Sequence, residues 1–155
     1  MKKILFSVAL LATTLLQQSF AQDTTKISPL LILYFGLKDA LVGGNANTAA
    51  ASASAFVTAL NSIDIEIVKE DSRNTLLNDA TAISQTGNLQ LQREKFATLS
   101  INMFELAKEV KLSTEPLYQQ YCPMKKASWL SSSKAIKNPY YGNAMLTCGS
   151  IKETL

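Results

Sequence analysis

Histidine is absent from the 155 residues of this chain. Its absence removes the commonest general base, every histidine-dependent catalytic triad and the usual nitrogen ligand of zinc and copper(II). A metal site would therefore have to use sulfur or oxygen. The serine run at residues 131–133 offers hydroxyl groups without a histidine base, and Glu105 and Glu109 fall on the expected solvated face of a helix. We expect a binding protein rather than an enzyme.

Neither sign of charge dominates the chain, which has 15 basic and 12 acidic residues. Without Lys2 and Lys3, 13 basic residues remain, a balance that does not fit a general nucleic-acid binder. The charge is uneven, however. Residues 116–155 hold five lysines and one acid, whereas residues 22–115 hold 8 basic and 11 acidic residues. We expect the basic tail to attract the rest of the chain or an acidic partner.

Long apolar runs are scarce, and the one at residues 4–16 directly follows Lys2 and Lys3. Ser19 and Ala21 place small residues at both recognition positions of a signal peptidase. The run is shorter than the roughly 20 apolar residues that a bilayer span needs. We therefore expect residues 1–21 to be a cleaved signal peptide and the mature chain to be periplasmic or secreted, without stable insertion in a membrane.

Four amphipathic patterns in the mature chain predict an all-α fold. The expected helices cover about residues 30–42, 47–63, 72–83 and 88–111. Their short polar links favour an up-down four-helix bundle that extends to about residue 113, within a single domain of residues 22–155. The expected N-caps are Ser28, Asn45 or Asn47, and Asn88.

The tail at residues 114–155 has a different composition. It holds three of the four prolines, four of the five tyrosines and the only tryptophan. Prolines and glycines interrupt regular structure, whereas aromatic side chains have too much apolar area to stay in water. We expect an irregular segment that packs on the bundle, with Trp129, Tyr140 and Tyr141 as a possible interaction surface.

Sulfur atoms gather in this tail as two close pairs. Pro123 separates Cys122 from Met124 and favours an extended backbone, in which residues two apart point to the same side. Met145 and Cys148 are three residues apart, so a helical turn would place them on one face. If the tail folds back on itself, all four sulfurs can meet. Thiolates and thioethers prefer copper(I), and by extension silver(I), over magnesium, calcium or manganese.

The residues leave three states of the cysteines open. In an oxidising compartment Cys122 and Cys148 often form a disulfide, which would stabilise the fold by about 3.5 kcal/mol in the chain-entropy model. The second state is a soft-metal site, and the third is a pair of free buried thiols. A disulfide would favour a structural or interaction module of the cell envelope.

Six strings of this sequence carry a family resemblance. They are YQQYCPM at residues 118–124, WLS at 129–131, NPYYG at 138–142, MLTCG at 145–149, YFGLKDALV at 34–42 and QREKF at 92–96. The strings are similar to those of an uncharacterised bacterial exported domain family. Its members occur alone behind signal peptides, or fused to the periplasmic adaptors of copper and silver efflux pumps.

The resemblance implies a helical domain that handles heavy metals in the periplasm, with an efflux adaptor or another envelope protein as partner. It places Cys122, Met124, Met145 and Cys148 at the positions of the presumed ligands. Relatives often carry a histidine in the middle helices, which this chain lacks, and a longer stretch before the tryptophan. These departures leave a sulfur-only site for copper(I) or a similar soft ion, or no site.

Overall fold

The computed structural model describes residues 24–155, with side chains from residue 29 onward. The predicted signal peptide at residues 1–21 lies outside the described residues. In chain order the elements are α1 (Thr24–Val42), α2 (Ala46–Ser62), α3 (Glu70–Ser84), α4 (Leu89–Glu109), β1 (Tyr118–Cys122), β2 (Ala127–Ser131), the 3₁₀-helix η1 (Gly142–Ala144) and β3 (Ser150–Thr154).

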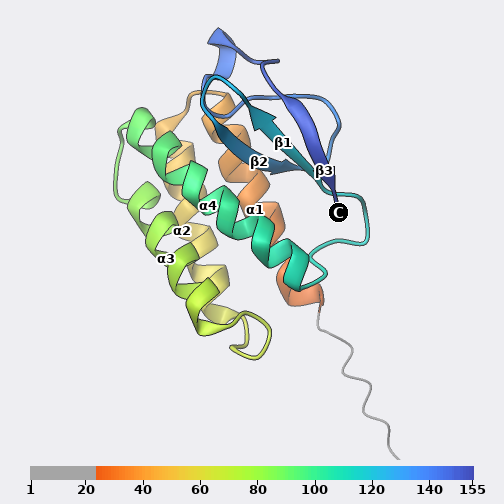
Figure 1. Ribbon diagram of the computed structural model, residues 1–155. Helices are drawn as coiled ribbons and strands as arrows, with labels where there is room; N and C mark the ends of the chain where they lie inside the picture. The colour runs from red at the N-terminus through yellow and green to blue at the C-terminus, as the bar shows by residue number, and fades with distance from the viewer. Residues whose placement is uncertain (1–23) are drawn as a thin grey trace, which may run out of the picture.

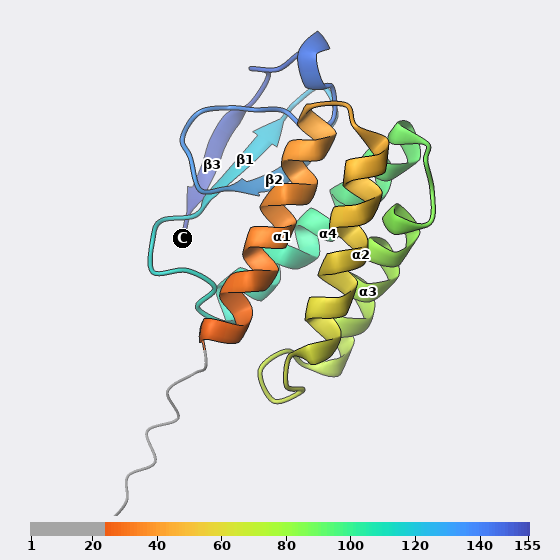
Figure 2. The same cartoon turned by 180° about the vertical axis from the view of Figure 1, so that it is seen from behind.

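The four predicted helices are confirmed, and successive helices alternate in direction (Figures 1 and 2). Asn45 and Asn88 cap α2 and α4, because their side-chain oxygens accept hydrogen bonds from backbone N–H groups in the first turn of each helix. The cap predicted at Ser28 is wrong, since α1 already begins at Thr24. Within residues 24–155, no helix combines the length and the apolar content needed to cross a membrane.

The tail contains three short strands between its turns and loops, and the all-α prediction therefore needs correction. β1, β2 and β3 form an antiparallel sheet in the order β2-β1-β3. Pro116 precedes β1, Pro123 begins the turn after it, and Pro139 lies in the loop beyond β2. Because the prolines stand outside the strands, every strand residue keeps the backbone N–H that a ladder requires. In this tail, the prolines that would interrupt a helix lie before or between strands.

The sheet packs beside α1 and α4, mainly through β2 (Figure 1). Four aromatic rings cross this junction in a row: Tyr34 stacks on Phe96 with centroids 5.3 Å apart, Phe96 lies 6.0 Å from Tyr140, and Tyr140 lies 5.9 Å from Trp129. The four side chains are at most 4% exposed. Bundle and sheet therefore share one core, and the large apolar area of the tail lies inside it.

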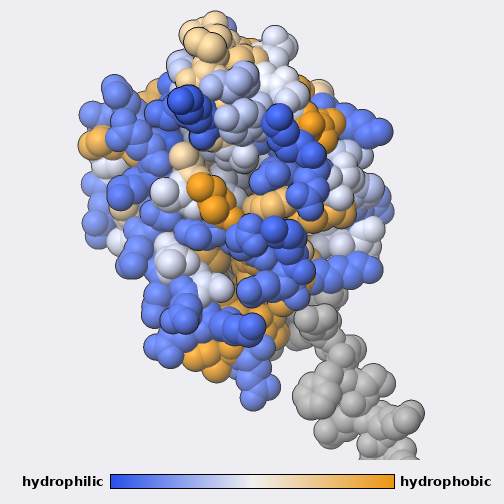
Figure 3. Space-filling model, in the orientation of Figure 1, coloured by the Kyte–Doolittle hydropathy of each residue, from blue (hydrophilic) through white to orange (hydrophobic). Residues whose placement is uncertain are grey.

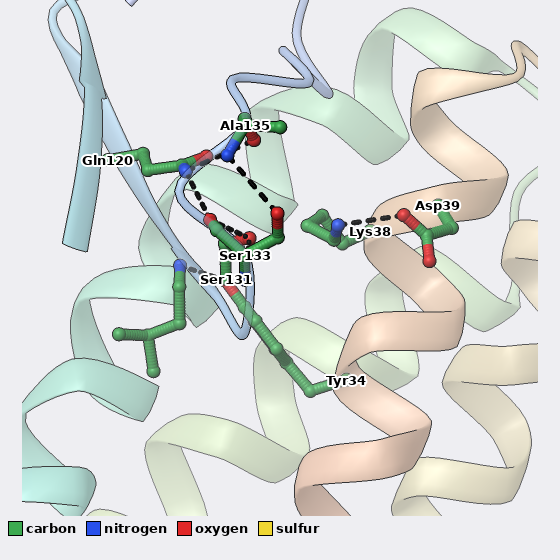
Figure 4. Close-up of polar contacts among 8 residues, drawn as sticks. Tyr34, Lys38, Asp39, Gln120, Ser131, Ser133 and Ala135 are labelled. Atoms are coloured by element: carbon green, nitrogen blue, oxygen red, sulfur yellow. Dashed lines mark hydrogen bonds and ion pairs between the residues drawn. The ribbon is translucent and has the colours of Figure 1, made fainter. Parts of the chain in front are cut away.

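Buried hydrogen bonds fix the sheet in this position. The Tyr34 hydroxyl bonds to the hydroxyl of Ser100 at 2.8 Å and accepts the backbone N–H of Leu130 at 3.0 Å, so one side chain joins α1, α4 and β2. Figure 4 shows Tyr34 reaching toward the strand from α1. It also shows Gln120, whose side-chain amide donates to the carbonyl of Ser133 and so fastens the loop after β2 to β1.

Candidate functional site

The two cysteines lie at the same end of the sheet. Cys122 is the last residue of β1, and Cys148 stands two residues before β3, whose Ser150 pairs with Tyr121. The two sulfur atoms are 3.6 Å apart, although 26 positions separate the residues in the chain. Both are free thiols, with Cys122 buried and Cys148 half-buried. The predicted meeting of these two distant segments is confirmed for the cysteines.

The hairpin turn between β1 and β2 surrounds the Cys122 sulfur with backbone donors. Pro123 has no N–H, but the N–H groups of the next two residues, Met124 and Lys125, hydrogen-bond to the Cys122 sulfur. Lys126 then adopts a φ of 55°, which turns the chain back into β2. The turn thus holds a buried sulfur against peptide dipoles that favour negative charge.

Asn138 holds the second cysteine in place from a fully buried position. Its side-chain amide donates to the Cys148 carbonyl at 2.8 Å, and its backbone N–H donates to the Leu146 carbonyl at 2.8 Å. Its side-chain oxygen accepts the backbone N–H of Tyr140. The Asn138 amide also hydrogen-bonds to the Cys122 sulfur. One side chain therefore positions both members of the thiol pair.

The pKa values of the two thiols shift in opposite directions. Burial opposes ionisation of Cys122, but hydrogen bonds from backbone N–H groups, Asn138 and Cys148 outweigh it and lower the pKa of the Cys122 thiol. The hydrogen bond to Cys122, followed by burial and by the neighbouring negative charge, raises the pKa of Cys148. The pair therefore holds its first negative charge on Cys122, with the Cys148 thiol as donor.

The two methionines predicted as ligands lie near the cysteines in the chain and differ in exposure. The Met124 side chain is 65% exposed, so it extends into solvent from the turn. Met145 is half-buried and follows η1, where its carbonyl accepts the N–H of Cys148. Within residues 24–155, no group of three histidine, cysteine or acidic side chains is placed to hold a metal ion. The geometry supplies two close sulfur ligands, and the predicted thioether ligands stay a proposal.

The aromatic residues predicted as an interaction surface are mostly interior. Trp129 is 1% exposed and Tyr140 is 4% exposed, because both belong to the row of rings between sheet and bundle. Tyr141 is half-buried. In this structure the predicted surface is therefore reduced to part of Tyr141, while the other two rings stabilise the junction.

Sequence analysis missed the positioning role of Asn138. The Asn-Pro pair at residues 138–139 indicates a turn, but the partners of a buried amide depend on where distant segments meet. Lys125 and Lys126 stand beside Cys122 in the sequence, which predicts that their positive charge favours its thiolate. The structure instead gives this role to backbone donors of the turn, one of them the N–H of Lys125.

Comparison with known proteins identifies a family for the helical part. A family profile described as "Protein of unknown function (DUF3347)" matches residues 30–115. The matched range covers more than half of the chain and ends before β1. No curated protein and no solved structure matches the chain.

Proposed function

The chain belongs to the DUF3347 family, and on that premise we propose that it is an exported protein that binds one soft monovalent metal ion, copper(I) or silver(I). Cys122 and Cys148 are the primary ligands in this proposal, and Met124 and Met145 are weaker donors. The protein would buffer the ion in the periplasm or pass it to an envelope partner such as an efflux adaptor. Binding and transfer, rather than catalysis, would be its activity.

The observation that carries the proposal is the 3.6 Å separation of two free thiols from segments far apart in the chain. This separation is well above the roughly 2.05 Å of a disulfide bond, so each cysteine remains a thiol that can ionise to a thiolate ligand. Soft thiolate ligands favour copper(I) over magnesium, calcium or manganese. The absence of histidine removes the nitrogen ligands that would favour zinc or copper(II).

Exposed Met124 suits transfer better than tight binding. A thioether carries no charge and binds weakly, so it can release the ion easily. The side chain lies on the solvent side of the turn whose backbone faces the buried Cys122. A partner approaching from solvent would therefore meet Met124 before the cysteines. Export to the periplasm is supported by the leader-like pattern of residues 1–21.

A titration of the reduced protein with copper(I) under anaerobic conditions tests the proposal, with a coloured chelator as competitor. We expect one equivalent to bind, and Cys122→Ser and Cys148→Ser each to lower the affinity by at least about 100-fold, because each removes a direct ligand. Met103→Leu, a buried methionine of α4, is the matched control for Met124→Leu and Met145→Leu. If both tail variants behave like Met103→Leu, the methionines are not ligands.

A second candidate function follows from the same closeness of the thiols. Because the two sulfurs are already close, oxidation can join them in a disulfide bond. The bond would then stabilise a structural or interaction module. Counting thiols in protein isolated from the periplasm without reductant separates the two functions. Two free thiols favour metal binding, whereas none favours the disulfide-bonded module.

A further inference from the structure

A positively charged hollow of about 350 Å³ includes Lys125, a residue of the turn that follows Cys122. Its lining consists of Gln90 and Arg93 from α4, Lys125 from the hairpin turn, and Tyr140 and Tyr141 from the loop before η1. The lining contains two cations and no acidic side chain. Its volume is at the lower end of the range typical of pockets for small organic ligands.

Arg93 is fixed in the wall of this hollow. Its Nε donates to the Pro139 carbonyl at 2.8 Å and one of its terminal nitrogens donates to the Leu41 carbonyl at 2.9 Å. These bonds tie α4 to the end of α1 and to the tail. Partial burial lowers the pKa of Arg93, and no carboxylate of residues 24–155 forms an ion pair with it. The guanidinium charge is therefore held in place and left without an internal counter-ion.

Lys125 connects the hollow to the thiols. Its side chain lines the hollow, while its backbone N–H hydrogen-bonds to the Cys122 sulfur. Tyr140 and Tyr141 also line the hollow, and they follow Asn138, whose side-chain amide donates to the Cys148 carbonyl. The two segments that position the sulfurs therefore also provide Lys125 and the two tyrosines of the lining, and α4 provides Arg93. On the face seen in Figure 3, hydrophilic side chains cover most of the surface and apolar groups are scattered.

We propose that this hollow binds the carboxylate of a small thiol compound, and that such a compound delivers the soft ion to Cys122 and Cys148. The delivery step rests on the function proposed above. An arginine and a lysine bind carboxylates as well as phosphates, and a small carboxylate compound can also carry the thiol that holds a soft ion. One compound could then bind in the hollow through its carboxylate and carry the ion on its thiol.

The delivery step is a ligand exchange without oxidation or reduction. A bond forms between the ion and the Cys122 sulfur, and the bond between the ion and the carrier sulfur breaks. The ion keeps its single positive charge. A thiol proton released by the protein cysteines neutralises the departing carrier thiolate, so charge and atoms balance. Binding of the carrier carboxylate near Lys125 would hold the two sulfurs together during the exchange.

Binding of S-methylglutathione to the reduced, metal-free protein tests the hollow. This probe has carboxylates, but its methylated sulfur cannot form a thiolate, so its binding does not depend on metal exchange. We expect NMR shifts at Lys125, Tyr140 and Tyr141, and a Kd about 3- to 10-fold higher in Lys125→Gln. Lys126→Gln is the matched control, because the adjacent Lys126 is exposed and does not line the hollow. It should leave the Kd unchanged.

A kinetic measurement then tests delivery. Transfer from the copper(I) complex of glutathione should slow in Lys125→Gln by a similar factor, whereas transfer from uncharged dithiothreitol should not change. Equal weakening of S-methylglutathione binding in Lys125→Gln and Lys126→Gln, or no binding at about 10 mM, would overturn the proposal. A tetraglutamate peptide provides a second comparison. If it binds more tightly than S-methylglutathione and its binding depends on Lys125, the ligand is an acidic protein partner and the small-molecule proposal is overturned.

The outcome for the hollow and the outcome for the metal site are distinguishable. If S-methylglutathione binds with the expected dependence on Lys125 but the cysteines take up no copper(I), the hollow is upheld and the copper function and delivery step are overturned. If copper(I) binds at the cysteines but the probe does not bind, the metal site is upheld and the hollow is overturned.

Discussion

The helical bundle (residues 24–109) and the C-terminal segment (residues 118–155) both contain buried amides that bind backbone carbonyls, such as Gln92 in the bundle, but they differ in their apolar contacts. Buried apolar side chains at helical spacing hold the bundle together. In the C-terminal segment, buried polar groups such as Asn138 and Gln120 bind backbone carbonyls of loops, and aromatic rings attach the sheet to the bundle. Apolar packing tolerates change of shape better than a buried hydrogen-bond network does. In the C-terminal segment, such a network also holds the thiol pair.

The largest expected effect tests whether the two regions unfold together. Phe96 is fully buried and lies between Tyr34 of the bundle and Tyr140 of the C-terminal segment. Phe96→Ala should lower the free energy of unfolding by about 3–5 kcal/mol, because it leaves a cavity in the shared core. Ile101→Ala, on the same helix but 54% exposed, should change it by less than about 0.5 kcal/mol.

Circular dichroism of the helices and fluorescence of Trp129 report the two regions separately during denaturation. Since Trp129 belongs to the shared core, both signals should change at the same denaturant concentration in the wild type and in Phe96→Ala. Separate transitions in the wild type would show that the sheet is an independent unit and that the comparison drawn above is wrong.

The next largest expected effect on the free energy of unfolding comes from a substitution that strains the backbone. Gly142 has a φ of +53°, and a Cβ at this position would lie 2.7 Å from the Val42 carbonyl oxygen and 2.9 Å from a terminal nitrogen of Arg93. Gly142→Ala should therefore cost about 1–3 kcal/mol of unfolding free energy. Gly87→Ala, between α3 and α4, is the control, because a Cβ there has no atom within 4 Å. Equal melting temperatures of the two variants would contradict the close contact between α1 and the C-terminal segment.

A third variant separates positioning from stability. Asn138→Ala removes the amide that holds the Cys148 carbonyl and faces the Cys122 sulfur. Copper(I) affinity should fall about 10- to 100-fold, as expected for loss of a group that orients a ligand. Asn102→Ala removes a side-chain hydrogen bond to Asp79 inside the bundle and should leave the affinity unchanged. Chelator competition on both variants measures this difference, and equal affinities would exclude a positioning role for Asn138.

The smallest expected effect is a change in the free energy of unfolding at alkaline pH. Burial raises the pKa of Tyr34, although hydrogen bonds to Ser100 and Leu130 partly oppose this. The unfolded chain releases this proton near pH 10, but the folded chain retains it, so Tyr34 makes stability fall as pH rises above 10. Tyr34→Phe should reduce the loss of unfolding free energy between pH 9 and pH 11 by about 1 kcal/mol. Half-exposed Tyr118 provides the control variant, Tyr118→Phe, and an equal change in both would rule out this explanation.

The bundle could be predicted from the sequence because its determinants are local. Asn45 and Asn88 lie next to the helices that they cap, and residues three and four apart define each buried face. The first helix was predicted too short, since Ser28 and Pro29 have the residue types of a helix start but lie within α1. In the tail, prolines and glycines marked the turns correctly but were interpreted as signs of irregular structure.

The site could be predicted only in part. The spacing of Cys122 and Cys148 suggested a meeting of two segments, and β1 and β3 pair so that the cysteines meet. The positions of Met124 and Met145 depend on turns whose geometry local sequence does not determine, and Met124 extends into solvent. Asn138 and Arg93 act through carbonyls of distant segments, so no short motif could have identified their partners.

X-ray absorption of the anaerobic protein loaded with one equivalent of copper(I) tests most directly whether Cys122 and Cys148 bind the same ion. We predict at least two sulfur neighbours of copper in the wild type and one sulfur fewer in Cys148→Ser. A spectrum with only oxygen or nitrogen neighbours, or an unchanged number of sulfur neighbours in Cys148→Ser, would contradict a metal site shared by the two thiols.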